Sequence, residues 1–128
     1  MSATALGTVL IVEDDQDIHD LVVSVLTEEG YNVHSSYDGI AGAQLLKQYQ
    51  PPPDHLCLVL LDMMMPNLDG VGVLRCLTQC GQYVPVVAMS ASTEWLGKAK
   101  QAGATATLKK PFDLDDLLKA VARYRLRR

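Results

Sequence analysis

The segment 58–70 constrains this chain most, because an apolar run of strand length ends there at an acid and a polar loop follows. The run 58–61 shows no polar alternation, which is typical of a strand buried on both faces of a parallel sheet. Ligands of open α/β sheets collect at the carboxyl ends of the strands. Asp62 therefore lies where a ligand-binding or reactive side chain is expected. Asp69 is better placed to cap the helix that follows.

Strand-like and helix-like segments alternate five times along the chain. Strands are expected at 8–12, 31–36, 56–61, 84–89 and 104–109. A helix is expected after each strand, with acidic N-caps at Asp15, Asp38, Asp69 and Asp113. Right-handed crossovers then give an α/β fold, a doubly wound parallel sheet of five strands with five helices on its two faces, flavodoxin-like in order.

Apolar stripes predict which side of each helix is buried. The first helix has the stripe Ile18, Leu21, Val22, Val25 and Leu26. The last has Leu114, Leu117, Leu118 and Val121. The fourth helix, 93–102, has only Trp95, Leu96 and alanines to bury, so we expect it to have low local stability.

Length and charge exclude several classes of protein. The 128 residues predict one domain, 1–128, with no effector domain after the last helix. A net charge of −4 argues against direct nucleic-acid binding, which needs a basic face. No apolar run reaches membrane-spanning length, and Cys57, Cys76 and Cys80 form no disulfide framework. A location in the reducing cytoplasm fits these observations.

Charged and polar side chains follow the ends of four of the expected strands: Glu13 and Asp14 after the first, then Asp62, Ser90 and Lys110. In a parallel sheet these ends meet at one edge. Two carboxylates about 5 Å apart repel by roughly 3 kcal/mol at an effective dielectric near 20. Such a cluster needs a cation, and hard oxygen ligands with room for water favour Mg²⁺.

Phosphoryl transfer onto a carboxylate is the chemistry that suits this set, because it needs positioning and charge neutralisation. Lys110 can neutralise an oxygen at the acidic group, Ser90 can donate a hydrogen bond to it, and the backbone carbonyl of Met64 offers a further metal ligand. Each residue also has an ordinary structural interpretation: acids cap helices, serines occupy turns and lysines are solvated. Their joint position around Asp62 favours the functional one.

Four segments resemble the receiver domain of two-component response regulators, in the family's order and spacing: 9–15, 61–70, 87–91 and 110–112. The resemblance covers essentially the whole chain. It implies that Asp62 takes a phosphoryl group from a histidine kinase or a histidine phosphotransfer protein. It also implies that Asp14 binds Mg²⁺ directly, that Glu13 acts through water, and that Met64 contributes its carbonyl.

The same resemblance assigns Ser90 as the switch hydroxyl and Lys110 as the motif lysine, whose Lys-Pro peptide is commonly cis in the family. Lys109 is then a bystander on the opposite face of the last strand. Two residues depart from the usual pattern. Glu13 stands where aspartate is more common, and Thr107 stands where many receivers have an aromatic residue that turns inward on activation.

The resemblance predicts a phosphoacceptor that at most dephosphorylates itself, with output to a protein target through the fourth helix, fifth strand and fifth helix. Three other classes stay open. An aspartyl phosphatase would want a second acid at Met64. A flavin-binding module would want a phosphate-cradling loop where segment 13–15 is acidic. A receiver-like interaction module would act without phosphorylation.

Overall fold

The structure is a computed structural model that describes residues 6–48, 56–65, 69–79 and 84–126. Strands and helices alternate along the chain, as predicted. The strands are β1 (Thr8–Val12), β2 (Asn32–Ser36), β3 (Leu56–Asp62), β4 (Val86–Ser90) and β5 (Ala106–Lys109). The helices are α1 (Gln16–Glu29), α2 (Gly39–Gln48), α3 (Gly70–Gln79), α4 (Thr93–Gln101) and α5 (Leu114–Ala122).

All strand pairs in the sheet are parallel, and the strand order is β2-β1-β3-β4-β5. Every residue of β1 and of β3 is buried, which explains why both sequences are apolar without alternation. The chain winds from β1 outward to β2 and then returns to β3 on the other side. The topological switch point therefore lies between β1 and β3, where ligands bind in folds of this kind.

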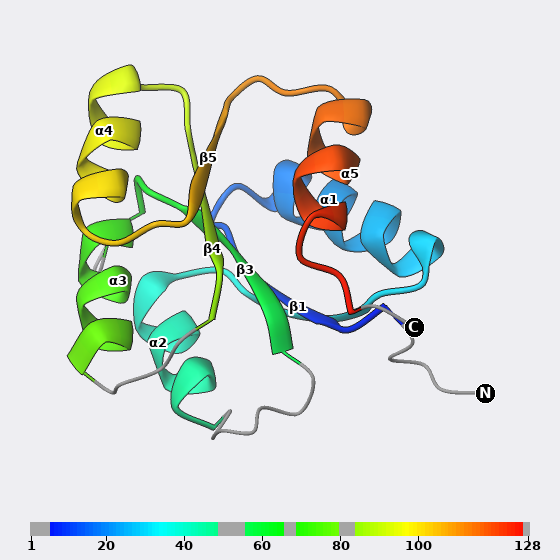
Figure 1. Cartoon of the computed structure of the whole chain (residues 1–128), viewed down its shortest axis with the longest axis horizontal. Coiled ribbons are helices and arrows are strands. Elements are labelled where there is room, and N and C mark those ends of the chain that lie inside the picture. The colour runs from blue at the N-terminus through cyan, green and yellow to red at the C-terminus, as the bar shows by residue number, and fades with distance from the viewer. Residues whose placement is uncertain (1–5, 49–55, 66–68, 80–83, 127–128) are drawn as a thin grey trace.

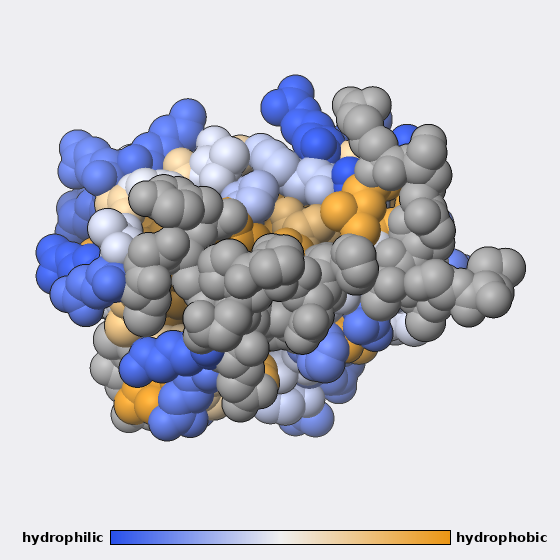
Figure 2. Space-filling model, turned by 60° about the horizontal axis from the view of Figure 1, so that its bottom comes forward, coloured by the Kyte–Doolittle hydropathy of each residue, from blue (hydrophilic) through white to orange (hydrophobic). Residues whose placement is uncertain are grey.

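Helices cover both faces of the sheet, with α1 and α5 on one face and α2, α3 and α4 on the other (Figure 1). Two buried clusters correspond to these layers. One includes Val22, Leu26 and Leu117 from the α1/α5 side, and the other includes Val73 and Leu77 of α3. On the face shown in Figure 2, apolar residues of the described surface are visible only in small separate areas among hydrophilic ones.

Side-chain caps fix where the helices begin. All four predicted caps are confirmed: Asp15, Asp38, Asp69 and Asp113 accept hydrogen bonds from backbone N–H groups three residues on. Ser92 does the same for α4 through the Trp95 N–H, at 3.3 Å. Because each cap immediately follows a strand or its loop, the caps hold the helix starts near the carboxyl edge of the sheet.

The prediction that Leu21 and Leu114 are buried is wrong, because Leu21 is 50% exposed and Leu114 is 43% exposed. In α1 the buried positions are His19, Val22 and Leu26, so the buried face is rotated toward His19 and away from Leu21. In α5 the buried pair is Leu117 and Val121. Leu114 is the first residue of the helix.

Three predicted strands start later than expected, at Asn32, Val86 and Ala106. The residues before these strands belong to the connections. The Tyr31 N–H donates a hydrogen bond to the Leu26 carbonyl at the end of α1, and the Pro85 carbonyl accepts a hydrogen bond from the Val59 N–H. β3 extends one residue further than predicted and includes Asp62.

Several predicted features lie outside the described residues, namely the three prolines at 51–53, Cys80, Gly81 and the loop 66–68. Cys57 and Cys76 are free thiols, and burial raises the pKa of Cys57 to about 11. Within the described ranges, none of the helices combines the length and apolarity that crossing a bilayer requires.

Candidate functional site

The sheet brings the predicted residues to one edge. Asp62 is the last residue of β3 and Ser90 the last of β4, while Glu13 and Lys110 directly follow β1 and β5. The strands end nearly level, since Asp62 pairs in register with Met89. This confirms that the carboxyl ends of four neighbouring strands carry the acids, the hydroxyl and the amine.

Three carboxylates form the acidic pocket, defined here as Glu13, Asp14 and Asp62. Each offers an oxygen, and these oxygens lie within 4.8 Å of one another. Glu13 is fully buried and Asp62 is 4% exposed, whereas Asp14 is exposed. The pocket therefore has a buried floor and one solvent-facing acid.

Lys110 lies against the buried side of the acidic pocket. Its Nζ is 2.7 Å from Glu13 Oε1 and 3.4 Å from Asp62 Oδ1, so it bridges two acids from different strands. With all groups ionised, one ammonium faces three carboxylates and the pocket retains two negative charges. A divalent cation would neutralise these two charges.

Backbone N–H groups orient two of the acids. The Asp15 N–H donates to Glu13 Oε2 at 3.1 Å, and the Met64 N–H donates to Asp62 Oδ1 at 3.3 Å. The Met64 side chain is 53% exposed, so this residue meets the pocket through its backbone. Among the described residues, no backbone N–H group donates a hydrogen bond to the other carboxylate oxygen of Asp62.

Ser90 is buried at the end of β4 and connects the pocket to α4. Its Oγ accepts a hydrogen bond from the Ser92 N–H at 3.0 Å, and its carbonyl accepts one from the Lys110 N–H at 2.9 Å. The Lys110–Pro111 peptide bond is cis, as the resemblance implied. Lys109 is exposed, and Thr107 is half-buried in β5 in register with Ala88.

Burial is the largest cause that raises the pKa of Asp62, to about 8. Hydrogen bonding with Asp14 and Glu13 and the charge of Glu13 raise it further, and Lys110 opposes them. For Lys110, burial lowers the pKa, but the hydrogen bond to Glu13 and the two nearby acids outweigh burial and raise it above its ordinary value. The pocket therefore disfavours a third negative charge without a cation.

The acidic pocket fits Mg²⁺ by its donor chemistry, because hard carboxylate oxygens converge from two strands with one acid exposed to water. Mg²⁺ keeps several waters and needs few protein ligands. Glu13, Asp14 and Asp62 are the residues that can hold it.

Two structural features were missed from the sequence. His19 is buried and stacks on Tyr37 with ring centroids 4.0 Å apart, while its Nδ1 lies 3.0 Å from Asp20 Oδ1. On α4, Lys98 Nζ lies 4.4 Å from the centroid of the Trp95 ring. The three-residue spacing of Trp95 and Lys98 on one helix face is the only signal that pointed to the second feature.

The strand order and the helices on both faces define a class, the flavodoxin-type α/β proteins, and the acidic pocket lies at the switch point of this fold. Residues 9–122 match the family model described as the response regulator receiver domain. The receiver domain of Francisella response regulator 1452 superposes with a TM-score of 0.81 at 28% identity, covering 92% of this chain and 95% of that one. Chemotaxis response regulator CheY4 of Vibrio cholerae gives 0.82 at 26% identity, covering 93% and 98%.

Two curated relatives differ in length. Sporulation initiation phosphotransferase F of Bacillus subtilis is 31% identical over 118 residues, which is 91% of each chain. A probable transcriptional regulatory protein of Picosynechococcus is 36% identical over 124 residues, or 94% of this chain and 49% of that protein. The chain thus spans about half the length of this second relative. It belongs to the response regulator receiver domain family of two-component signalling.

Proposed function

We propose that Asp62 is the phosphoacceptor of this receiver domain and takes a phosphoryl group from a histidine kinase or a histidine phosphotransfer protein. One observation carries the proposal. Asp62 is 4% exposed, yet it shares a pocket with two further acids and lies 3.4 Å from Lys110 Nζ. A structural aspartate does not need this set of neighbours.

In the transfer, an Asp62 carboxylate oxygen attacks phosphorus, the bond from phosphorus to the donor imidazole nitrogen breaks, and an acyl phosphate forms. Lys110 neutralises negative charge on the oxygens of the phosphoryl group under transfer, and the Met64 N–H keeps Asp62 oriented. Glu13, Asp14, Asp62 and the Met64 carbonyl would hold Mg²⁺, which would supply the remaining charge neutralisation.

Ser90 is the proposed switch residue. Its hydroxyl accepts the Ser92 N–H. A phosphoryl group on Asp62 carries nearly two negative charges, which attract this hydroxyl as a donor. The bond to Ser92 then weakens, and the start of α4 moves. We place the output face on α4, β5 and α5, where Thr107 stands in place of the usual aromatic residue.

The proposed partners and location follow the family. The net charge of −4 argues against direct nucleic-acid binding by residues 1–128, which we treat as one receiver unit. We expect the unit to act in the cytoplasm on a protein target, and to have at most self-dephosphorylating activity.

The direct test is labelling with acetyl phosphate, followed by intact-mass measurement. The expected result is the addition of one phosphoryl group in Mg²⁺ and almost none in EDTA. Asp62→Asn should remove labelling, whereas Asp115→Asn, an exposed acid of α5, should leave it unchanged. Persistent failure of the natural protein to label in Mg²⁺ would favour an interaction module that works without phosphorylation.

A further inference from the structure

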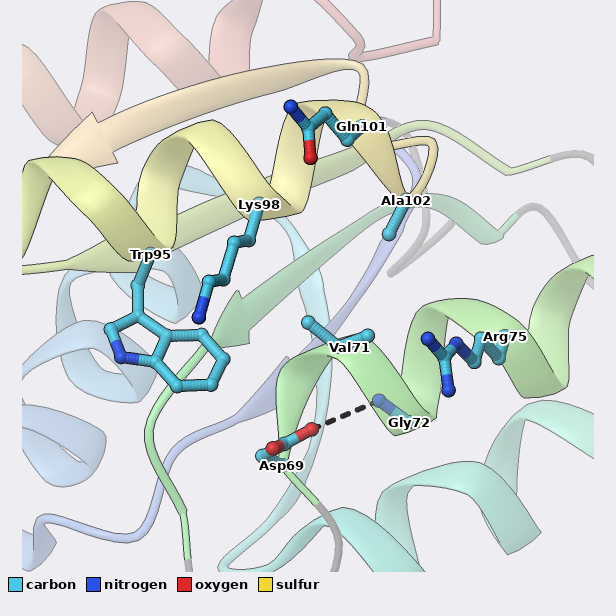
Figure 3. A pocket seen from close by; sticks show the side chains of 8 residues that line it. All are labelled: Asp69, Val71, Gly72, Arg75, Trp95, Lys98, Gln101 and Ala102. Carbon is cyan, nitrogen blue, oxygen red and sulfur yellow. Dashed lines mark hydrogen bonds between the residues drawn. The ribbon is translucent and has the colours of Figure 1, made fainter.

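A groove between α3 and α4 lies outside the acidic pocket, and its α3 wall is not part of the output face proposed above. It has a volume of about 760 Å³ and is open along one side, and both helices line it (Figure 3). Its apolar part consists of Val71, Trp95 and Ala102, which are partly buried edge residues of the core cluster beneath. A hydrophobic side chain seated here would extend that core.

Cationic side chains border the groove on both helices. Arg75 comes from α3, and Lys98 comes from α4, with its ammonium over the Trp95 ring. In the described part of the chain, no acidic group lies within ion-pair distance of Arg75, and Lys98 has only the exposed Glu94 at 3.7 Å. A pair of that kind is weak and easily exchanged.

Of the described residues that line the groove, Asp69 is the one acid, and it is already engaged. Asp69 accepts the Gly72 N–H at 3.0 Å and caps α3, as Figure 3 shows. In a chain with a net charge of −4, this groove therefore presents two available cations around an apolar floor. Its charge is complementary to an acidic ligand.

We propose that the α3–α4 groove binds an acidic peptide segment of a partner protein, in which carboxylates flank an apolar side chain. A small-molecule site normally encloses most of its ligand. This groove is open along the helices, which suits a segment that covers it with its own backbone. The apolar side chain would contact Trp95, and the carboxylates would pair with Arg75 and Lys98.

Hydrogen bonds connect both walls of the groove to residues that adjoin the acidic pocket. The Trp95 N–H donates to Ser92 Oγ, and the Ser92 N–H donates to Ser90 Oγ. On the other wall, the Gly70 N–H donates to the Met63 carbonyl, next to Asp62. If the function proposed above holds, movement of Ser90 toward a phosphoryl group changes the position of Trp95 and hence the affinity of the groove.

The test uses the full chain and a fluorescein-labelled amphipathic helical peptide whose polar positions are glutamate, with a matched glutamine peptide as control. Binding is followed by anisotropy and by the emission of Trp95, the only tryptophan. We expect the glutamine peptide to bind about tenfold more weakly. Arg75→Gln and Lys98→Gln should each weaken binding about fivefold, and Lys100→Gln, an exposed α4 lysine outside the groove, less than about twofold.

Equal binding of the two peptides to the natural protein, or no binding of either, would overturn the proposal, and this comparison requires no variant to fold. A second arm adds beryllofluoride and Mg²⁺. A change in affinity of about threefold or more, lost in Ser90→Ala, supports the coupling, and an unchanged affinity refutes it. If the protein bound the glutamate peptide more tightly than the glutamine peptide but was never phosphorylated at Asp62, the groove proposal would be supported and the phosphoacceptor proposal refuted.

Discussion

At the scale of single residues, Asp62 is in an environment that opposes its own ionisation. Burial and two neighbouring acids raise its pKa to about 8, far above the ordinary 3.8. A carboxyl group whose pKa is higher in the folded than in the unfolded protein stabilises the fold most at pH values below its pKa in the unfolded state. This contribution is lost as the pH rises through its pKa in the folded state. The metal-free protein should therefore lose stability between about pH 4 and pH 8.

Asp62→Asn should remove much of this pH dependence, because the amide has the shape of the carboxyl group and no charge. We expect the variant to be more stable than the natural protein by about 2 kcal/mol or more at pH 8.5 in EDTA, and to differ little near pH 4. Urea unfolding at both pH values measures this. If the free energy of unfolding changed with pH in the same way in both proteins, the raised pKa of Asp62 would not be the cause of the pH dependence.

Lys110 bridges Glu13 and Asp62, so its removal leaves buried carboxylates without a counter-charge. Lys110→Met should destabilise the metal-free protein by about 2–3 kcal/mol at pH 7.5, and Mg²⁺ should raise its thermal midpoint more than that of the natural protein. The control is Lys109→Met, because Lys109 is exposed and should change stability by less than about 0.5 kcal/mol. Equal effects at the two positions would contradict the bridging role.

At the scale of elements, the start of α3 is packed tightly against the end of β3. A Cβ added at Gly70 would lie 2.7 Å from the Met63 Cα, a backbone atom that cannot move aside easily. Gly70→Ala should therefore destabilise the protein by about 1–3 kcal/mol, as measured by thermal or urea unfolding.

Gly97 in α4 provides the matched control, since a Cβ there would meet nothing within 4 Å. Gly97→Ala should stabilise the helix by about 0.5–1 kcal/mol. A loss of stability at Gly97 equal to that at Gly70 would mean that the close approach to Met63 is not the cause.

The sequence predicts the existence and type of these elements well, because the caps and apolar runs act locally. Strand starts are less predictable: Tyr31 and Pro85 have strand-like neighbours, but the positions of neighbouring strands decide where pairing begins. Leu21 and Leu114 were assigned to buried stripes, yet both are exposed. Leu114 is the first residue of α5, and Leu21 is exposed because α1 is rotated against the sheet. That rotation depends on tertiary packing, which periodicity does not determine.

At the scale of the whole molecule, topology converts dispersed residues into a site. Glu13 and Lys110 are 97 positions apart and lie in hydrogen-bond contact. Their proximity was predictable because parallel strands share one carboxyl edge. The α3–α4 groove was not predictable in this way, since it depends on how two helices pack side by side on one face of the sheet (Figure 1).

The same topology connects the acidic pocket with α4. Ser90 ends β4, Ser92 caps α4, and Trp95 lies one turn further on, so two hydrogen bonds join Ser90 to the backbone N–H of Trp95, whose side chain lines the groove. α4 has only Leu96 and Ala99 buried, as its weak apolar face predicted. An element held by so few buried side chains is suited to move when its cap is disturbed.

The central claim is that Asp62, and no other acid of the pocket, accepts the phosphoryl group. Its most direct test is to label the protein with acetyl phosphate in Mg²⁺, reduce the acyl phosphate with borohydride, and locate the altered residue by peptide mass spectrometry. We predict a single altered position, Asp62, which disappears when EDTA replaces Mg²⁺. Alteration at Asp14 or Asp69, or labelling that is indifferent to Mg²⁺, would contradict the account.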